Sequence, residues 1–230
     1  MKVLIPPGKS GNVLATIAIG EQYLQPFMKY AYHTWEMYCR RHDLGLILFD
    51  DHLIAKSDPN WKNPYWQKFL IGDYLSKQKF GIRSVCCLDT DILISPLAPN
   101  IFENRDETKV GLVSKRQNLP FEHRSILRRM AFLRNRYYDS SYPLDSSLFI
   151  NLEDLYKVAG LPAQEDDACS GVFVFSCKEH GKKLADYYSS FDQSVMDRDG
   201  GGEQIFLNYL VQSNRIVEWL DYRFQALWTY

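Results

Sequence analysis

The sequence has no long apolar run. No stretch approaches the roughly 18 consecutive apolar residues that a membrane-spanning helix requires, so we expect no transmembrane segment. The apolar run near the start of the chain, from Val3 to Ile5, is also too short for the hydrophobic region of a secretory signal.

Cysteine is scarce and irregularly placed. The five cysteines are odd in number and show no C-x-x-C spacing, which argues against a zinc site or a disulfide framework. Cys86 and Cys87 are adjacent within an apolar run, so we interpret them as buried strand residues. This pattern favours a reducing compartment, and we expect a cytoplasmic protein.

Net charge is also nearly absent. The value of −1 gives no case for general binding of nucleic acid. Residues 115–136 are a local exception, because they contain seven lysines and arginines against Glu122 alone. This segment indicates either a contact for a phosphorylated or acidic acceptor or a solvated amphipathic helix.

The composition that remains is that of a globular α/β protein. The chain has 230 residues, of which 46% are hydrophobic and 24% charged. This length suits one large domain over residues 1–230, and we find no linker, repeat or low-complexity segment that would divide it. Aromatic residues reach 14%, and an aromatic core explains them better than a lining for sugars and bases.

Apolar runs and helical periods alternate through the first ninety residues. We predict strands at 13–19, 46–49 and 85–88, with helices at 26–42, stopped by Gly45, and at 64–79, capped by Asn63. This β-α-β-α-β order predicts a mostly parallel central sheet flanked by helices. Ligands bind such sheets at the carboxyl ends of the strands, where Gly20, Asp50 and Asp89 fall.

The rest of the chain continues the same alternation less regularly. We predict strands at 110–113, 171–175 and 216–220, and helices at 178–191 and 203–212, the last after the glycines 200–202. Helical periodicity also runs through the basic segment, with Ile126, Met130 and Leu133 on one face.

Asp89 and Asp91 are the main candidates for chemistry. They follow the apolar run 85–88 and precede a second apolar run, 92–94. If the segment is extended, the two side chains point to one side, about 6–7 Å apart. Two hard oxygen ligands in this arrangement can share a divalent cation, one directly and one through water, and such a cation can bridge two phosphates.

Two weaker patterns lie later in the chain. Asp166 and Asp167 precede small residues and a strand, where a ligand can approach the backbone closely. Glu203 and Gln204 place a carboxylate and an amide at a helix start after three glycines. An ordinary strand-entry turn explains the first pattern equally well, and a capped helix start explains the second.

Taken in order, these segments resemble glycosyltransferases with the glycosyltransferase-A fold. Segment 88–94 resembles the strand–DxD–strand signature, 170–175 looks like the later small-residue strand, and 203–208 is similar to the (D/E)-Q-x-x-L-N helix start. Segment 15–23 resembles the first strand and nucleotide loop, and 66–69 the helix before the DxD strand. The similarity spans residues 15–228 and is strongest to glycogenin-like and galactosyltransferase-like members.

The resemblance implies a fold and an activity. The fold is a single Rossmann-like glycosyltransferase-A domain. The activity is transfer of a sugar from a nucleoside-diphosphate-sugar, preferably a UDP-sugar, to the hydroxyl of a carbohydrate, lipid-linked or protein acceptor, with Mn²⁺ or Mg²⁺ as cofactor and no nucleic acid partner.

The resemblance also implies roles for individual residues. Asp89 and Asp91 are expected to hold the metal and the diphosphate. Thr16, Ala18 and Tyr23 are expected against the base, and Lys68 against the donor sugar or phosphates. Asp167 and Ser170 are expected to face the sugar and acceptor, with Glu203 and Gln204 near the reacting carbon.

One feature of the resembling family is missing. Many members carry a late His-x-x-Gly-x-x-Lys-like segment whose histidine completes the metal shell, whereas no histidine follows His180 here and the sequence ends at Tyr230. The expectation is therefore either a chain truncated at its C-terminus or a metal shell completed by water.

Two other functions fit parts of the sequence. Asp89-Thr90-Asp91 after an apolar strand also matches much of the haloacid-dehalogenase phosphatase motif, although that motif usually follows the first strand and favours Thr or Val at the position of Leu93. A non-catalytic sugar-nucleotide-binding domain that docks a partner through residues 115–136 is the other alternative.

Overall fold

The computed structural model describes residues 1–117, 119–137, 150–198 and 202–226. Gly200 and Gly201 of the predicted glycine run lie outside these ranges. The last four residues, 227–230, also lie outside them, and so does the end of the resemblance at residue 228. The strands are β1 (Lys2–Ile5), β2 (Asn12–Ile17), β3 (Gly45–Phe49), β4 (Ser84–Leu88), β5 (Val110–Ser114), β6 (Ala168–Ser176) and β7 (Val217–Trp219).

Helices connect these strands and cover the sheet. Most of the helical segments lie between the strands: α1 (Glu21–Pro26), η1 (Phe27–Ala31), α2 (Tyr32–His42), α3 (Pro64–Gln67), η2 (Lys68–Leu70), α4 (Ile71–Ser76), α5 (His123–Tyr137), α6 (Leu152–Val158), η4 (Cys177–Gly181), α7 (Lys182–Ser189) and α8 (Gln204–Ser213). Two short 3₁₀ turns, η5 (Gln193–Asp197) and η7 (Tyr222–Gln225), complete the described elements. Within the described ranges, no helix has the length and apolar character needed to cross a lipid bilayer.

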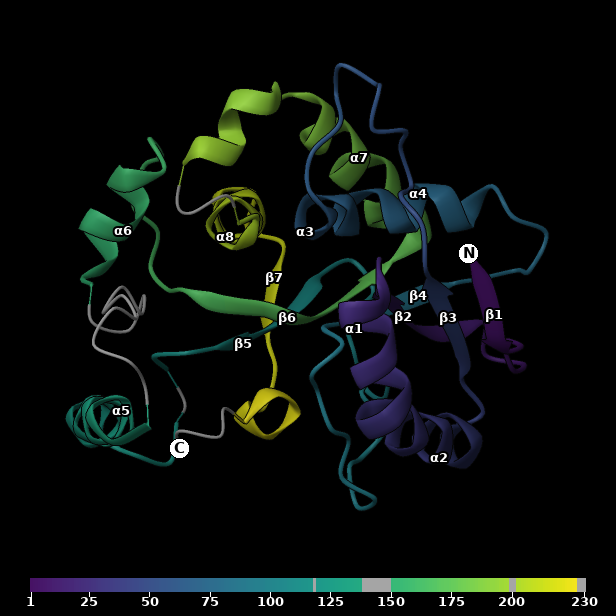
Figure 1. Cartoon of the computed structure of the whole chain (residues 1–230), viewed down its shortest axis with the longest axis horizontal. Helices are drawn as coiled ribbons and strands as arrows, with labels where there is room; N and C mark the ends of the chain where they lie inside the picture. Colours follow the sequence, from purple (N-terminus) through teal and green to yellow (C-terminus); the bar gives the residue numbers. More distant parts are fainter. Residues whose placement is uncertain (118, 138–149, 199–201, 227–230) are drawn as a thin grey trace.

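The seven strands form one mixed sheet in the order β1-β3-β2-β4-β6-β5-β7. β3, β2 and β4 are parallel neighbours, as the alternating sequence predicts, whereas β6 runs antiparallel to β4 and to β5. In Figure 1, α3, α4, α7 and α8 lie on one face of this sheet and α1 and α2 on the other. The predicted α/β class, with a sheet that is parallel at its core and flanked by helices, is confirmed.

The continuous apolar strands are explained by burial on both faces. In β4, Val85 and Cys87 join one hydrophobic cluster, whereas Cys86 and Leu88 join the other. Successive strand residues point to opposite faces, and a sheet covered on both sides needs apolar residues at every position. The predicted burial of Cys86 and Cys87 is confirmed.

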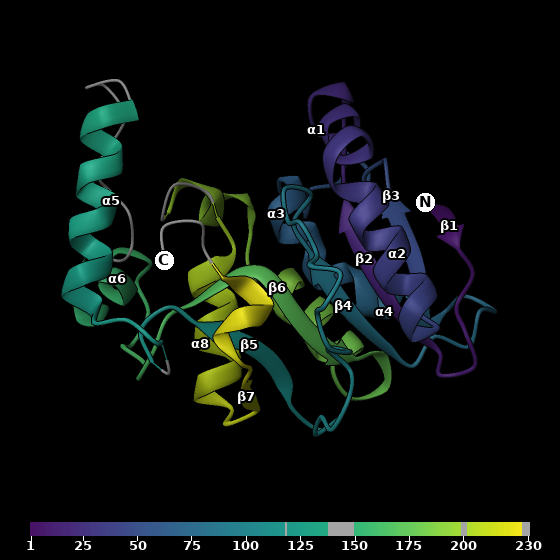
Figure 2. The same ribbon diagram turned by 90° about the horizontal axis from the view of Figure 1, so that it is seen from below.

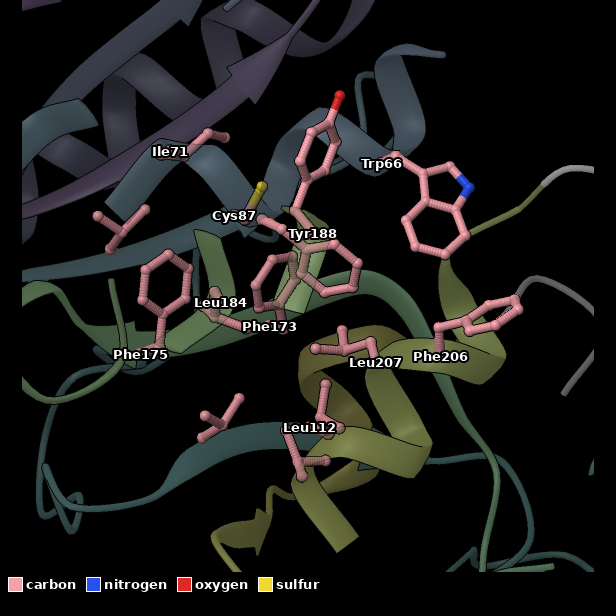
Figure 3. Packing of buried hydrophobic residues seen from close by; sticks show 14 of the residues in the cluster. Trp66, Ile71, Cys87, Leu112, Phe173, Phe175, Leu184, Tyr188, Phe206 and Leu207 are labelled. Atoms are coloured by element: carbon pink, nitrogen blue, oxygen red, sulfur yellow. The ribbon is translucent and has the colours of Figure 1, made fainter. Parts of the chain in front are cut away.

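The larger hydrophobic cluster lies between the sheet and the helices α3, α4, α7 and α8. Figure 3 shows Trp66 of α3 and Phe206 of α8 against one another, with Phe173 and Phe175 of β6 nearby. Gly72 of α4 and Gly181 of η4 bring these helices together, because a Cβ built on Gly72 would lie 2.9 Å from Cα of Gly181. This packing fixes the helices that carry the polar residues described below.

Several predicted boundaries were wrong. The first helix begins at Glu21, not at residue 26, and Pro26 is the last residue of α1, so the amide hydrogen that proline lacks falls where the α-helix changes to the π-helical stretch η1. The predicted end of the helix at residue 42 is confirmed, but Asp43, with φ 55°, and not Gly45 ends it, and Gly45 already belongs to β3. Lys68 to Leu70 interrupts the predicted helix 64–79 as a 3₁₀ turn, and Asn63 makes no side-chain cap hydrogen bond.

One strand and one α-helix, β1 and α6, were not predicted at all. β1 is an edge strand of only four residues, and α6 follows a segment with little periodicity. In contrast, residues 92–94 were expected as a strand after Asp91 and do not form one. Their backbone bonds instead to α2, through Trp35 Nε1 to the Ile92 carbonyl at 2.7 Å.

Candidate functional site

Asp89 and Asp91 lie in a turn at the carboxyl end of β4. The Asp89 amide donates to the Gly171 carbonyl of β6 at 2.9 Å, and the Ile92 amide donates to the Asp89 carbonyl at 3.2 Å. The second bond closes a β-turn, so the extended geometry expected for this segment is wrong. Asp91 is exposed, and the Asp89 side chain is 40% exposed.

Lys68 connects Asp89 to Glu203. Its Nζ lies 2.6 Å from Asp89 Oδ1 and 3.1 Å from Glu203 Oε1, and it also donates to the Ser170 carbonyl at 3.4 Å. Lys68 comes from the 3₁₀ turn η2, and Glu203 from the residue before α8. Lys68 and Glu203 are both buried, so this ion pair is formed away from bulk water.

The charge of Lys68 is maintained by its two carboxylates. Burial of the ammonium lowers the pKa, but the negative charges of Glu203 and Asp89 outweigh burial and raise the pKa of Lys68 above its ordinary value. Lys68 is therefore a fixed positive charge directly behind the acidic turn.

Gln204 joins a second polar group to the first. Its Oε1 accepts from the Ser170 amide at 3.3 Å, and its Nε2 donates to Asp167 Oδ1 at 3.5 Å. Asp167 is fully buried and forms an ion pair with Lys115, with 2.5 Å between Nζ and Oδ2. The structure thus brings together Lys68, Ser170, Glu203, Gln204 and Asp167 from three separate parts of the chain.

A pocket of about 790 Å³ opens beside the acidic turn. Tyr23, Tyr65 and Trp61 give it an aromatic wall, and Lys68, Asp89 and Asp91 a charged end. The side-chain hydrogen bond between Tyr65 and Tyr23 stabilises the neutral phenol of Tyr65 and, together with partial burial, raises its pKa. The volume and the mixture of aromatic and polar groups suit a small polar ligand with a planar ring.

A second pocket, of about 540 Å³, shares the acidic turn with the first. Asp89, Asp91 and Leu93 line both pockets. The second pocket also includes Gly171 of β6 and Gln225 of η7. The acidic turn is therefore a common boundary at which ligands in the two pockets can meet.

Several predicted site residues lie behind the pockets. Thr16 and Ala18 are buried and line neither pocket; Thr16 Oγ1 donates to the Leu88 carbonyl at 2.7 Å. Alternation along the chain turns Ile17 and Ile19 to the larger pocket instead. Neither pocket is lined by Asp167, Ser170, Glu203 or Gln204. Their connection to the larger pocket is indirect, through Lys68, which lines it and contacts Glu203 and the Ser170 carbonyl.

The sequence reasoning missed most of the aromatic wall. Trp61, Tyr65 and His52 line the larger pocket and were not singled out. Their signal was positional, because all three follow the carboxyl end of β3, where parallel sheets bind ligands. His52 and Trp61 lie in the connection to the next helix, and Tyr65 lies in α3 itself. Asp50, which was singled out at that strand end, instead pairs with Lys2 at 2.8 Å and lines neither pocket.

The acidic turn has the ligand chemistry of a divalent-cation site. Asp89 Oδ1 is engaged by Lys68, but Asp89 Oδ2 and the exposed Asp91 carboxylate are available to a cation. A Cβ built on Gly171 would lie 3.1 Å from Asp89 Oδ2, so the glycine keeps the space beside that oxygen open. Hard oxygen ligands of this kind suit Mg²⁺ or Mn²⁺. Among the described residues, no group of three or more His, Cys, Asp or Glu side chains could hold a metal, so a cation at this turn would need further ligands from water or from a bound molecule.

Comparison with known proteins gives information on the fold. No protein-family model matches the sequence, and no curated protein is similar to it in sequence. A structure described as a glycosyltransferase involved in the glycosylation of the major capsid of PBCV-1 has a TM-score of 0.53, with 10% identity over 92% of this chain and 81% of that chain. Mouse xyloside xylosyltransferase 1, in its apo form, gives a TM-score of 0.45 and 13% identity, covering 92% of this chain and 86% of that chain. The first similarity shows that the chain shares the fold of a glycosyltransferase of known structure.

Proposed function

We propose that this protein is a glycosyltransferase that uses a nucleoside-diphosphate-sugar, with a UDP-sugar as the preferred donor. The observation that carries the proposal is the acidic turn, which is backed by a buried lysine and shared by two adjoining pockets. The fold similarity to a glycosyltransferase supports the same class of reaction. We propose that the sugar is received by a hydroxyl group of a carbohydrate, lipid-linked or protein acceptor.

The larger pocket is the proposed donor site. Its aromatic wall offers stacking surfaces for the base through Tyr23, Tyr65 and Trp61. We propose that the diphosphate binds at its charged end, beside the acidic turn. In this arrangement the reacting sugar carbon lies near the boundary with the second pocket, which is the proposed acceptor site.

Asp89 and Asp91 are the proposed ligands of Mn²⁺ or Mg²⁺. When bound, the cation supplies positive charge that offsets the charge of the departing diphosphate. Lys68 orients the Asp89 carboxylate from behind and adds a second positive charge within the same region. Glu203 holds Lys68 in that position, and Gln204 fixes the Ser170 backbone that Lys68 also contacts.

The chain then contributes mainly by positioning and electrostatics. The acceptor oxygen forms a bond to the anomeric carbon of the sugar while the bond from that carbon to the diphosphate oxygen breaks. The diphosphate leaves with the electron pair of that bond, and the hydroxyl proton passes to a basic oxygen of the site or to solvent. Glu203 was expected near the reacting carbon; because it is buried against Lys68, we propose a positioning role for it.

The test is calorimetric binding of a panel of nucleotide-sugars with and without Mn²⁺, using Asp91→Asn as the main variant. Asp91 is exposed, so this substitution should leave folding intact. We expect one donor to bind only with Mn²⁺, and Asp91→Asn to weaken that binding at least tenfold because a metal ligand is lost. Asp186→Asn, at an exposed position paired with Lys182 on α7, is the matched control and should bind as the parent chain does.

Each alternative predicts a different result. A haloacid-dehalogenase-type phosphatase would hydrolyse phosphate esters through a covalent aspartyl-phosphate on Asp89, detectable by mass spectrometry. A non-catalytic domain would bind the donor with Mn²⁺ but release no nucleoside diphosphate with any acceptor. Absence of metal-dependent binding by every donor tested would contradict the transferase proposal.

Gly171 provides an independent prediction about the same site. In Gly171→Ala, the new Cβ would lie 2.5 Å from Gln225 Nε2 and 3.1 Å from Asp89 Oδ2, so one of these groups must move. We expect metal-dependent donor binding to weaken about tenfold while the free energy of unfolding falls by roughly 1–3 kcal/mol. Calorimetry and urea denaturation measure the two effects. Adding Gln225→Ala removes the nearer group, so the double variant should regain binding if the displaced Gln225 side chain blocks the ligand. Unchanged binding in Gly171→Ala itself would show that the ligand does not use the space beside Asp89 Oδ2.

A further inference from the structure

A surface outside the candidate site concentrates positive charge. Helix α5 contains five arginines and no acidic residue. Because the whole chain has a net charge of −1, the remainder of the protein carries −6. A net positive charge is therefore concentrated on this helix, and a segment of this kind is typical of contacts with anionic surfaces.

The helix lies at the edge of the molecule. Of its side chains that the structure describes, Ile126 alone is buried, and neither hydrophobic cluster contains a residue of α5. In Figure 2, α5 stands at one end of the protein, with the sheet between it and α1 and α2. A helix in this position can reach a flat surface without bringing the acidic remainder of the protein close to it.

The outward face of α5 combines arginine with an exposed aromatic ring. Arg124, Arg128 and Phe132 follow at intervals of four residues and so share one face. All three are exposed, with Phe132 at 60%, and Arg129 is exposed beside them. No carboxylate in the described part of the chain forms an ion pair with Arg124, Arg128 or Arg129.

We propose that α5 docks the protein on an anionic lipid bilayer. The arginines meet the acidic headgroups, and Phe132 enters the boundary between headgroups and acyl chains. A nucleic acid strand is the less suitable occupant, because such strands follow grooves lined by several elements, and α5 offers one convex face at the edge of an otherwise acidic protein. The proposal does not depend on the proposed transferase activity.

The test is co-sedimentation of the full chain with vesicles of phosphatidylcholine alone or of phosphatidylcholine and phosphatidylglycerol in equal parts. We expect binding to the anionic vesicles only, weakening as salt is raised because the headgroup charges are screened. Each arginine near an anionic surface strengthens binding by about fivefold. The triple variant R124Q/R128Q/R129Q should therefore bind about 100-fold more weakly, and Phe132→Ser should lose the part of binding that persists at high salt.

A matched variant separates this helix from net charge. Lys79, Lys178 and Lys183 are exposed residues outside α5, and K79Q/K178Q/K183Q removes the same total charge. This control should bind anionic vesicles as the parent chain does, and circular dichroism checks that both triple variants fold. Three results would each overturn the proposal. The first is equal binding to neutral and anionic vesicles, and the second is an equal loss of binding in the control variant. The third is tighter binding to a single-stranded RNA homopolymer than to anionic vesicles at the same salt.

Discussion

Replacing Lys68 by methionine is expected to destabilise the protein by about 3–5 kcal/mol and to abolish metal-dependent donor binding. Methionine keeps much of the length of the side chain but removes the charge that Glu203 and Asp89 share. Glu203 is 3% exposed, so its carboxylate would be left buried without a counter-charge, and breaking a buried pair in this way costs about that amount. Urea denaturation and donor calorimetry measure the two losses.

The double variant Lys68→Met/Glu203→Gln separates the structural from the functional effect. Removing both charges eliminates the unpaired buried carboxylate, so we expect recovery of at least half of the lost stability. Donor binding should stay weak, because Asp89 is still without the lysine that orients it. A double variant no more stable than Lys68→Met would show that the ion pair does not account for the loss.

Replacing Trp66 by alanine is expected to destabilise the protein by a similar amount, about 3–5 kcal/mol. The ring is fully buried and contacts Phe69, Phe191 and Phe206, with centroid separations of 5.8, 5.8 and 4.8 Å. Truncation leaves a cavity that these rings cannot fill without moving. In a protein of this size the melting temperature should fall by on the order of 10 °C.

The contacts of Trp66 also connect stability to the site. Phe206 lies in the first turn of α8, two residues after Gln204, so a loosened ring contact should disturb the position of Glu203 as well. Circular dichroism is the suitable probe, because fluorescence would change with the loss of tryptophan itself. Trp66→Phe keeps an apolar ring and should lose less than half as much stability; an equal loss in both variants would point to the indole nitrogen, not to packing.

The local sequence determined the elements around the site but not their orientation. The apolar run 85–88 identified a strand that ends at two candidate aspartates, and β4 and Asp89 are found there, although the segment after Leu88 was expected to be extended and forms a turn. The resemblance to glycosyltransferases implied that Thr16 and Ala18 lie against the ligand, whereas the structure turns Ile17 and Ile19 to the pocket. A displacement of one residue along a strand reverses every side chain, and apolar residues on both faces give no signal for the correct alternative.

The site residues from distant segments show the same limit. Lys68 and Glu203 were both singled out, yet nothing in the sequence indicated that they form an ion pair across 135 residues. Lys115 was interpreted only as part of a basic segment, and the structure pairs it with the buried Asp167. Partners of this kind depend on which helices pack together, and packing is decided by the whole core.

The sequence by itself determined the α/β class, the parallel core β3–β2–β4 and the position of the two aspartates after β4, because periodicity and chain order act over short distances. Only the tertiary structure decided that β6 runs antiparallel beside β4, that residues 89–92 form a turn and not an extended strand, and that Lys68 lies behind that turn. Those features depend on contacts between residues far apart in the chain, whose free energies the local pattern does not contain.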